Sequence, residues 1–396
     1  MPTNASIAPA STDFSLVVGG PLYQLFLRTR LARPPLDLLN RRVAVITLVA
    51  WLPLLVLSLL AGQALGGVTI PFLKDVDAQV RLLVALPLLI LAEKIVHERL
   101  RPAVTLFVEK GIVRPDDRLR FDGIVASTLR WRNSVAVELV LFALVLTVGH
   151  ILWVDKLAVH GATWFARSTD SGPALTRAGL WYAWVSVPIF QFILIRWWFR
   201  LVLWARFLWL VSRLDLDLSP SHPDRAGGLG FLGTSTAAFA PLLVAQSALV
   251  SAMAAGRILN DGAQMQSFKV ELAGMLGFAL LQTLGPLFVF GPALARAKRR
   301  GLREYGLLGD RYVREFDGKW LRGGAAPGES LVGTSDIQSL ADLSGSFDVV
   351  RSMRTFPFGK ETVLQLAVTT ALPGLPLLLT VMPLDEIVKK LVGAIL

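Results

Sequence analysis

Long apolar stretches constrain this chain more than any other feature of its sequence. Seven of them are long enough for an α-helix to cross about 30 Å of hydrocarbon. The shortest, residues 82–96, reaches this length only if its helix continues for one more turn. Backbone polar groups find no water there, so we expect helices, which satisfy those groups internally. Residues are 54% hydrophobic and 17% charged, whereas soluble domains carry about 25% charged residues. The sequence therefore predicts an all-α polytopic membrane protein with seven transmembrane helices, at residues 43–65, 82–96, 134–154, 178–214, 233–255, 270–296 and 363–382.

Positive charge is distributed unevenly between the segments that connect these spans. If the N-terminus is inside, 31 of the 40 Lys and Arg residues fall on the inner side. Because cytoplasmic loops collect Lys and Arg, we expect an N-inside, C-outside protein of a bacterial-type inner (plasma) membrane. The same rule accounts for the formal net charge of +11, so the expected partner is the lipid bilayer and not nucleic acid. The chain has no cysteine, which excludes disulfides and thiolate metal sites.

The chain divides into four predicted regions. Several helices are expected to continue past the membrane as a cytoplasmic helical layer, because amphipathic or helical patterns follow the spans without a break. These extensions are residues 115–134, a continuation of helix six to about Tyr305, and a helix from Ser335 to Met353. The regions are a cytoplasmic N-terminal segment with an interfacial or re-entrant piece (1–42), transmembrane helices one to six (43–296), a cytoplasmic helical linker (297–362), and a broken seventh transmembrane helix with an extracytoplasmic C-terminus (363–396).

The last predicted span is interrupted near its middle by two prolines and a glycine. Proline lacks the N–H group that a helix needs, so carbonyl groups of the preceding turn are freed. In hydrocarbon such groups must face protein or water, and broken helices are typical of transport and pore sites. We therefore predict that helices six and seven line a path; the alternative is a plain proline kink. The candidate path residues are Thr369, Thr370, Pro373, Gly374, Pro376, Thr380 and, in helix six, Pro286.

A loop rich in acids and glycines connects the predicted fourth and fifth helices. Glycine-rich backbone before a helix lets amide groups point at an anion, here with Arg225 beside them. Alternatively, carboxylates and an imidazole gather a divalent cation. A third interpretation is a tight turn in which Asp224 caps local backbone. No other cofactor is expected. The candidate residues for a bound anion or metal are Asp215, Asp217, His222, Asp224, Arg225, Gly227 and Gly228.

Four ionisable residues fall in or near the spans: Glu93, His97, Glu138 and His150. Such groups are costly in a membrane and mark ion or proton pathways by default. Anchoring at the interface or pairing between helices is the alternative. Arg196, Arg200 and Arg206 alternate with tryptophans in helix four, a pattern that favours an aromatic belt with arginines at lipid headgroups.

Three functions fit these patterns. The first is an oligomeric ion channel or transporter, a homo-oligomer whose path is lined by helices six and seven. The second is a membrane-embedded enzyme or lipid-handling protein that acts on an anionic headgroup at the loop 222–233. The third is a sensor or scaffold whose cytoplasmic layer binds a partner. No hydrolase motif such as Gly-x-Ser-x-Gly or His-Glu-x-x-His occurs, so the sequence favours a non-enzyme and indicates no catalytic residue.

Overall fold

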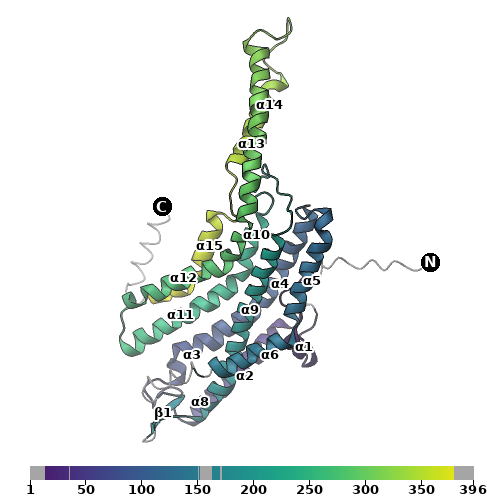
Figure 1. The fold of residues 1–396 in the computed structure, drawn as a ribbon. Coiled ribbons are helices and arrows are strands. Elements are labelled where there is room, and N and C mark those ends of the chain that lie inside the picture. Colours follow the sequence, from purple (N-terminus) through teal and green to yellow (C-terminus); the bar gives the residue numbers. More distant parts are fainter. Residues whose placement is uncertain (1–13, 35, 150, 152–162, 170–171, 379–396) are drawn as a thin grey trace, which may run out of the picture.

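The computed structural model describes residues 14–34, 36–149, 151, 163–169 and 172–378. It is a bundle of tilted helices from which a two-helix arm projects (Figure 1). The α-helices are α1 (Pro21–Arg28), α2 (Leu39–Leu60), α3 (Val76–Val80), α4 (Leu86–Glu109), α5 (Arg118–Arg132), α6 (Val135–Leu144), α8 (Arg177–Trp181), α9 (Val187–Val211), α10 (Phe231–Ser235), α11 (Ala240–Asp261), α12 (Lys269–Leu284), α13 (Gly291–Phe316), α14 (Ser335–Arg351), α15 (Lys360–Ala371) and α16 (Leu375–Leu378).

Short 3₁₀ or π segments connect many of these helices without a loop. A π segment (Arg81–Ala85) links α3 to α4, another (Tyr182–Ser186) links α8 to α9, and a 3₁₀ segment (Thr236–Phe239) links α10 to α11. Polar residues fix several helix starts, because Asp75, Ser134 and Thr176 each accept a hydrogen bond from an amide of the first turn. The all-α prediction omits one short antiparallel hairpin, β1 (Ala166–Thr169) with β2 (Gly172–Leu175).

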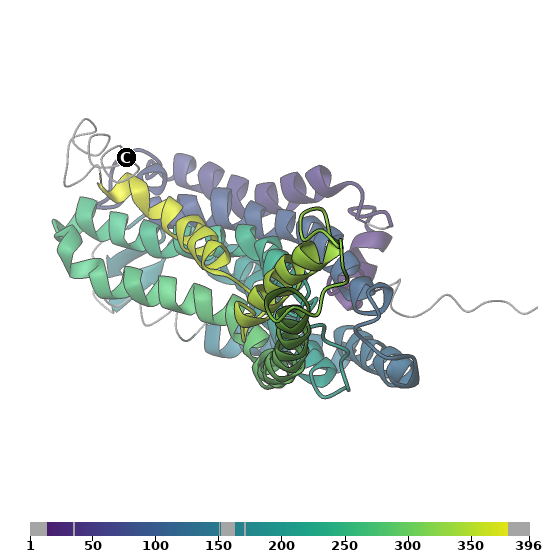
Figure 2. The ribbon, with the colours of Figure 1, turned by 90° about the horizontal axis from the view of Figure 1, so that it is seen from above.

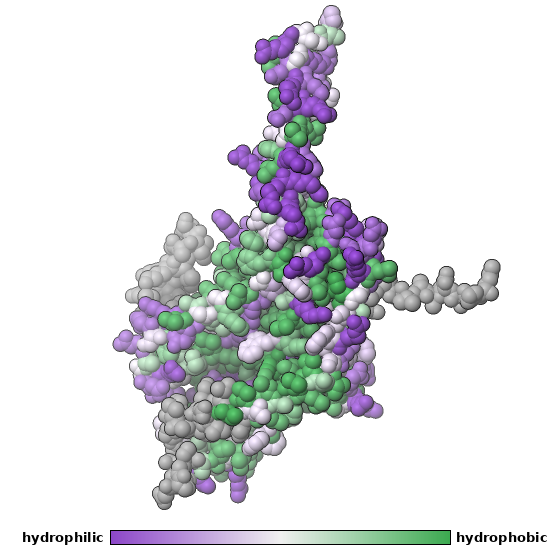
Figure 3. Space-filling view, viewed as in Figure 1, coloured by the Kyte–Doolittle hydropathy of each residue, from purple (hydrophilic) through white to green (hydrophobic). Residues whose placement is uncertain are grey.

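Four helices among the described residues are long and apolar enough to cross a membrane: Leu39–Leu60, Arg177–Val211, Phe231–Asp261 and Met265–Leu321. A fifth candidate is the pair Pro115–Arg132 and Val135–Gly149, which is bent by 46°. On the face shown in Figure 3, apolar residues predominate on the body of the protein and hydrophilic residues are concentrated on the arm. Seven spans and the N-inside orientation stay predictions.

The predicted second and seventh spans differ from the other five. Residues 76–109 are helical throughout, but Arg81, Glu93 and Lys94 interrupt the apolar stretch. In the seventh, α15 is followed by a 3₁₀ turn (Leu372–Gly374) and by α16. Residues 379–382 of that predicted span lie outside the described residues. The end of helix six was predicted too early: α13 continues beyond Tyr305 to Phe316, because no Gly-Pro break stops it.

The core lies around α4 and α9, which pack against each other and against neighbouring helices. Aromatic rings fill its centre: Phe107 contacts Phe121 and Phe207, and all three are fully buried. The N-terminal segment Phe14–Val18 enters this core, where the Phe14 ring lies 5.0 Å from that of Phe207. Residues 14–17 are therefore inserted in the bundle, which goes beyond the interfacial piece that the sequence suggested.

Connecting segments gather at two ends of the bundle. At the end that carries β1, Trp164 donates a hydrogen bond to Asp75 over 2.8 Å (Figure 1). At the end from which the arm projects, the amide of Asp217 donates to the carbonyl of Ile112, and Arg354 donates to the carbonyl of Asp224 over 2.8 Å. The arm is formed by α13 and α14 (residues 302–351), which run side by side.

Candidate functional site

A strongly basic groove lies where α13 passes the loop after α9. Its volume is about 600 Å³, within the usual range of ligand sites, roughly 300–1,000 Å³. Five arginines line it and one carboxylate faces them, so the lining has an excess of positive charge. The lining residues are Arg114, Leu214, Asp215, Leu216, Leu218, Ala293, Arg296, Ala297, Arg299, Arg300 and Arg303. We call this surface the basic groove.

Helix geometry places four of these arginines together. Residues 296, 299, 300 and 303 are spaced by three, one and three, so they share one face of α13. Arg296, Arg299 and Arg303 are exposed, and the one carboxylate among the residues that line the groove is that of Asp215. Lys298 points elsewhere, because its ammonium group donates to the carbonyl of Met353 over 2.8 Å. The groove is therefore a surface of guanidinium groups and not a general Lys/Arg face.

Backbone contacts hold the opposite wall of the basic groove in place. Leu216 pairs with Val113 in an isolated antiparallel bridge. The amide of Asp215 donates to a carboxylate oxygen of Asp117 over 3.1 Å, and the Asp215 side chain forms an ion pair with Arg114. Arg300 donates to the carbonyl of Leu218 over 3.2 Å. This wall is built by backbone hydrogen bonds, so its shape does not depend on a ligand.

The predicted anion or metal loop adjoins the groove but is organised around Asp224. One carboxylate oxygen of Asp224 accepts the amides of Ala226 (2.8 Å) and Gly228 (3.2 Å), and the other accepts the amide of Gly230 (2.8 Å). Gly227 and Gly228 have φ of 63° and 96°, a conformation that favours glycine. The amides that the anion hypothesis assigns to an external ligand therefore donate to the chain's own carboxylate. This geometry is the one that the tight-turn interpretation of the loop describes.

Other members of the predicted loop lie apart from a common centre. His222 Nδ1 lies 2.9 Å from Oδ1 of Asp224. In contrast, Asp215 faces Arg114, and Asp217 is exposed. Arg225 has a positive φ of 53° and accepts the amide of Arg354 through its carbonyl. Within the described residues, no group of three or more His, Asp and Glu side chains could hold a metal ion.

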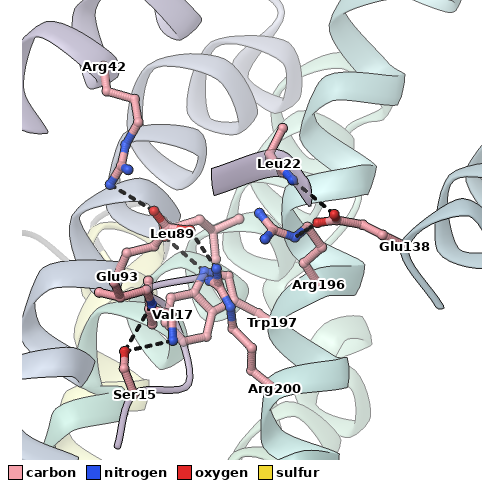
Figure 4. A network of polar contacts seen from close by, with 11 residues as sticks. Ser15, Val17, Leu22, Arg42, Leu89, Glu93, Glu138, Arg196, Trp197 and Arg200 are labelled. Carbon is pink, nitrogen blue, oxygen red and sulfur yellow. Dashed lines mark hydrogen bonds and ion pairs between the residues drawn. The ribbon is translucent and has the colours of Figure 1, made fainter. Parts of the chain in front are cut away.

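Two of the predicted intramembrane carboxylates lie in a buried ionic cluster (Figure 4). Glu93 on α4 forms ion pairs with Arg42 on α2 (2.7 Å) and with Arg200 on α9 (2.8 Å). Glu138 on α6 pairs with Arg196 on α9 over 2.9 Å and also accepts the amide of Leu22. The predicted headgroup position of Arg196 and Arg200 is therefore wrong: they are 8% and 4% exposed, because two carboxylates attract them inward.

The remaining predicted polar residues occupy different places. His97 contacts the hydroxyl of Ser15 over 2.9 Å, and His150 lies outside the described residues. In the seventh helix, Thr369 and Thr370 donate back to carbonyls one turn earlier, Pro373 and Gly374 are half-buried, and Pro376 is exposed. Thr380 lies outside the described residues. Pro286 occupies the first turn of a 3₁₀ segment (Gly285–Phe290) between α12 and α13.

Sequence reasoning missed the basic groove as a unit. The arginine spacing on α13 was visible in the sequence, but the opposite wall comes from residues 113–117 and 214–218, about 180 and 80 positions earlier in the chain, and only the fold brings them together. The chain matches no protein-family model, and no curated protein or solved structure gives a significant match. Its function is therefore argued from the site alone.

Proposed function

We propose that this protein is embedded in a membrane and binds an anionic, phosphate-bearing lipid headgroup in the basic groove. The observation that carries the proposal is the set of five arginines facing a single carboxylate in a groove of about 600 Å³. Guanidinium groups bind phosphate oxygens through two parallel hydrogen bonds, which makes arginine the preferred residue for phosphate recognition. This places the protein in the lipid-handling class, with the site on α13 instead of on the loop 222–233.

The position of the groove along α13 supports a lipid headgroup as the ligand. The candidate span Met265–Leu321 is apolar over its first half, and its first arginine is Arg296. Arg299 and Arg303 follow one and two turns later. Arginines directly after an apolar helical stretch lie at the depth of lipid phosphates. Because the groove and the arm share α13, a bound headgroup would act on the helix that carries the arm, which fits a lipid-responsive sensor.

The test is the triple variant Arg296→Gln, Arg299→Gln and Arg303→Gln, which spares Arg300 because that residue holds the groove wall. We expect the purified protein to bind a short-chain anionic phospholipid at least tenfold more weakly than the parent, measured by fluorescence titration in neutral detergent. Removal of three phosphate contacts removes several charge-assisted hydrogen bonds.

The matched control is Arg311→Gln, Arg314→Gln and Arg322→Gln, which removes the same charge from exposed positions in the distal part of the arm. It should bind like the parent. Phosphatidylcholine should compete poorly, because its net charge is zero. Equal weakening in both triple variants would show a nonspecific charge effect and would overturn the proposal.

Conduction along the sixth and seventh predicted helices is the second candidate function. It is supported by buried polar groups where α15 lies across α11 and α12 (Figure 2). Ser247 donates to the carbonyl of Thr370, and the buried hydroxyl of Ser251 has no hydrogen-bond partner among the described residues. Gln246 and Gln282 pair across α11 and α12. Homo-oligomerisation belongs to this candidate and is likewise a proposal.

Cysteine scanning tests the conduction candidate in this cysteine-free chain. Single cysteines at 369–377 should react with a water-soluble thiol reagent at the positions that face Ser247 and Ser251, because a conducting path is wet. Exposed Leu364 and Val368 provide lipid-facing controls that should stay unreactive. Uniform protection across 369–377 would assign the proline break to packing.

A further inference from the structure

The buried ionic cluster contains more positive than negative charge. Arg42, Arg196 and Arg200 are each no more than 8% exposed, and the carboxylates that face them are Glu93 and Glu138. Arg132 at the end of α5 adds a fourth, half-buried arginine at the rim. Among the described residues, His97, which contacts Ser15, and the buried Tyr23, close to Arg42 and Glu93, also face the cluster. Within the part of the chain that the structure describes, four arginines therefore meet two glutamates.

Each oxygen of the two carboxylates already has a partner. Glu93 is shared between Arg42 and Arg200, one oxygen for each. Glu138 uses one oxygen for Arg196 and the other for the amide of Leu22. Among the described residues Arg132 forms no ion pair: it donates to the carbonyl of Ser15 over 2.6 Å and to the side chain of Asn133. Withdrawing a charge from water without a counter-charge is unfavourable, so a small anion beside the half-buried Arg132 would stabilise the cluster.

A small cavity lies beside three of the four arginines of the cluster. It is lined by Arg132, Arg196 and Arg200, with Glu138 on one side, and measures about 20 Å³. One water molecule needs about 10–15 Å³, so the cavity admits a single small ion and excludes a phosphate headgroup. Ser134 and Val137 also line it. They belong to the N-cap and first turn of α6, a ten-residue helix, so the positive end of its dipole adds to the field.

We propose that this cavity binds one chloride ion between Arg132, Arg196 and Arg200. The ion would reduce the excess positive charge by one. It would also accept hydrogen bonds from Arg132, because the oxygens of Glu138 already accept from Arg196 and from the amide of Leu22. Leu16 closes one side of the cavity, and Arg132 holds the carbonyl of the adjacent Ser15. A bound chloride would thus also stabilise the insertion of the N-terminal segment Phe14–Val18.

The experiment measures thermal unfolding of the purified full chain in neutral detergent, with sodium gluconate replaced stepwise by sodium chloride at constant ionic strength. We expect a saturable rise in the unfolding midpoint, because a ligand that binds the native state stabilises it by mass action. Bromide should substitute for chloride, whereas sulfate, which is too large for the cavity, should behave like gluconate. Stabilisation by sulfate equal to that by chloride would overturn the proposal.

Two substitutions should change the chloride response in opposite directions. Arg132→Gln removes one positive charge without breaking a carboxylate pair, and should raise the half-saturating chloride concentration at least tenfold. Glu138→Gln keeps an oxygen acceptor but adds one more unbalanced positive charge, and should lower that concentration. Arg130→Gln, an exposed arginine on the same helix, is the control and should respond like the parent. The proposal fails if Arg132→Gln keeps the parent response, or if the parent has none.

Discussion

Replacing Glu93 with alanine is expected to lower the free energy of unfolding by about 3–5 kcal/mol. Glu93 is 7% exposed and pairs with two arginines that come from different helices, Arg42 and Arg200. Alanine leaves both guanidinium groups buried without a counter-charge, and the cluster then holds four arginines against Glu138 alone. The purified variant should unfold at a much lower temperature when followed by circular dichroism in neutral detergent.

Glu98→Ala provides the matched control for this prediction. It makes the same substitution on the same helix, but the Lys94–Glu98 pair is 3.8 Å long and more than half exposed. Exposed pairs of this kind contribute less than about 1 kcal/mol, so Glu98→Ala should unfold close to the parent. Glu93→Gln, which retains one oxygen acceptor, should fall between the two alanine variants. If Glu93→Ala and Glu98→Ala unfold alike, the cluster does not hold α2, α4 and α9 together.

The sequence predicted the carboxylates of this cluster but not their partners. Glu93 and Glu138 stand out because a carboxylate inside an apolar stretch is costly. The same reasoning applies to Arg196 and Arg200, but their neighbouring tryptophans favoured an interfacial position. Trp197 is in fact fully buried and donates to the carbonyl of Leu89 over 2.8 Å. Whether a tryptophan on a helix faces lipid or protein depends on where the neighbouring helices pack. The periodicity of the sequence does not reveal those neighbours.

The helical class of the fold was predictable because it follows from composition and from the length of the apolar stretches. Boundaries were predictable where a polar residue caps a helix, as at Ser134 and Thr176. They were not predictable where one helix continues into the next through 3₁₀ or π turns, as at Gly285–Phe290, because prolines in first-turn positions do not end a helix there. The inserted segment Phe14–Val18 was also missed, since a short apolar segment gives no sign of its docking place.

Asp224→Ala is expected to lower the free energy of unfolding by about 3 kcal/mol or more, since it leaves three amide groups in a buried turn without an acceptor. Those amides belong to Ala226, Gly228 and Gly230. Asp217→Ala, an exposed aspartate in the same loop, should change stability by less than about 0.5 kcal/mol. Thermal unfolding of both variants beside the parent measures the difference, and equal midpoints for the two would contradict the capping role.

Two further measurements connect Asp224 with the predicted anion site. Burial alone would raise the pKa of Asp224, but its three backbone hydrogen bonds and the nearby His222 hold that pKa below the ordinary value. The stability that the carboxylate contributes is therefore present above about pH 4, and is lost as the pH falls through the lowered pKa of the folded state. The difference in unfolding midpoint between the parent and Asp224→Ala should accordingly be constant near neutral pH and become smaller in acid.

Asp224→Ala also leaves a ring of free amide groups that suits an anion. Inorganic phosphate at constant ionic strength should raise the midpoint of Asp224→Ala more than that of the parent, because in the parent the protein's own carboxylate already occupies the ring. A phosphate response of equal size in both proteins would place the anion elsewhere, and the guanidinium donors of the basic groove are the nearest alternative site.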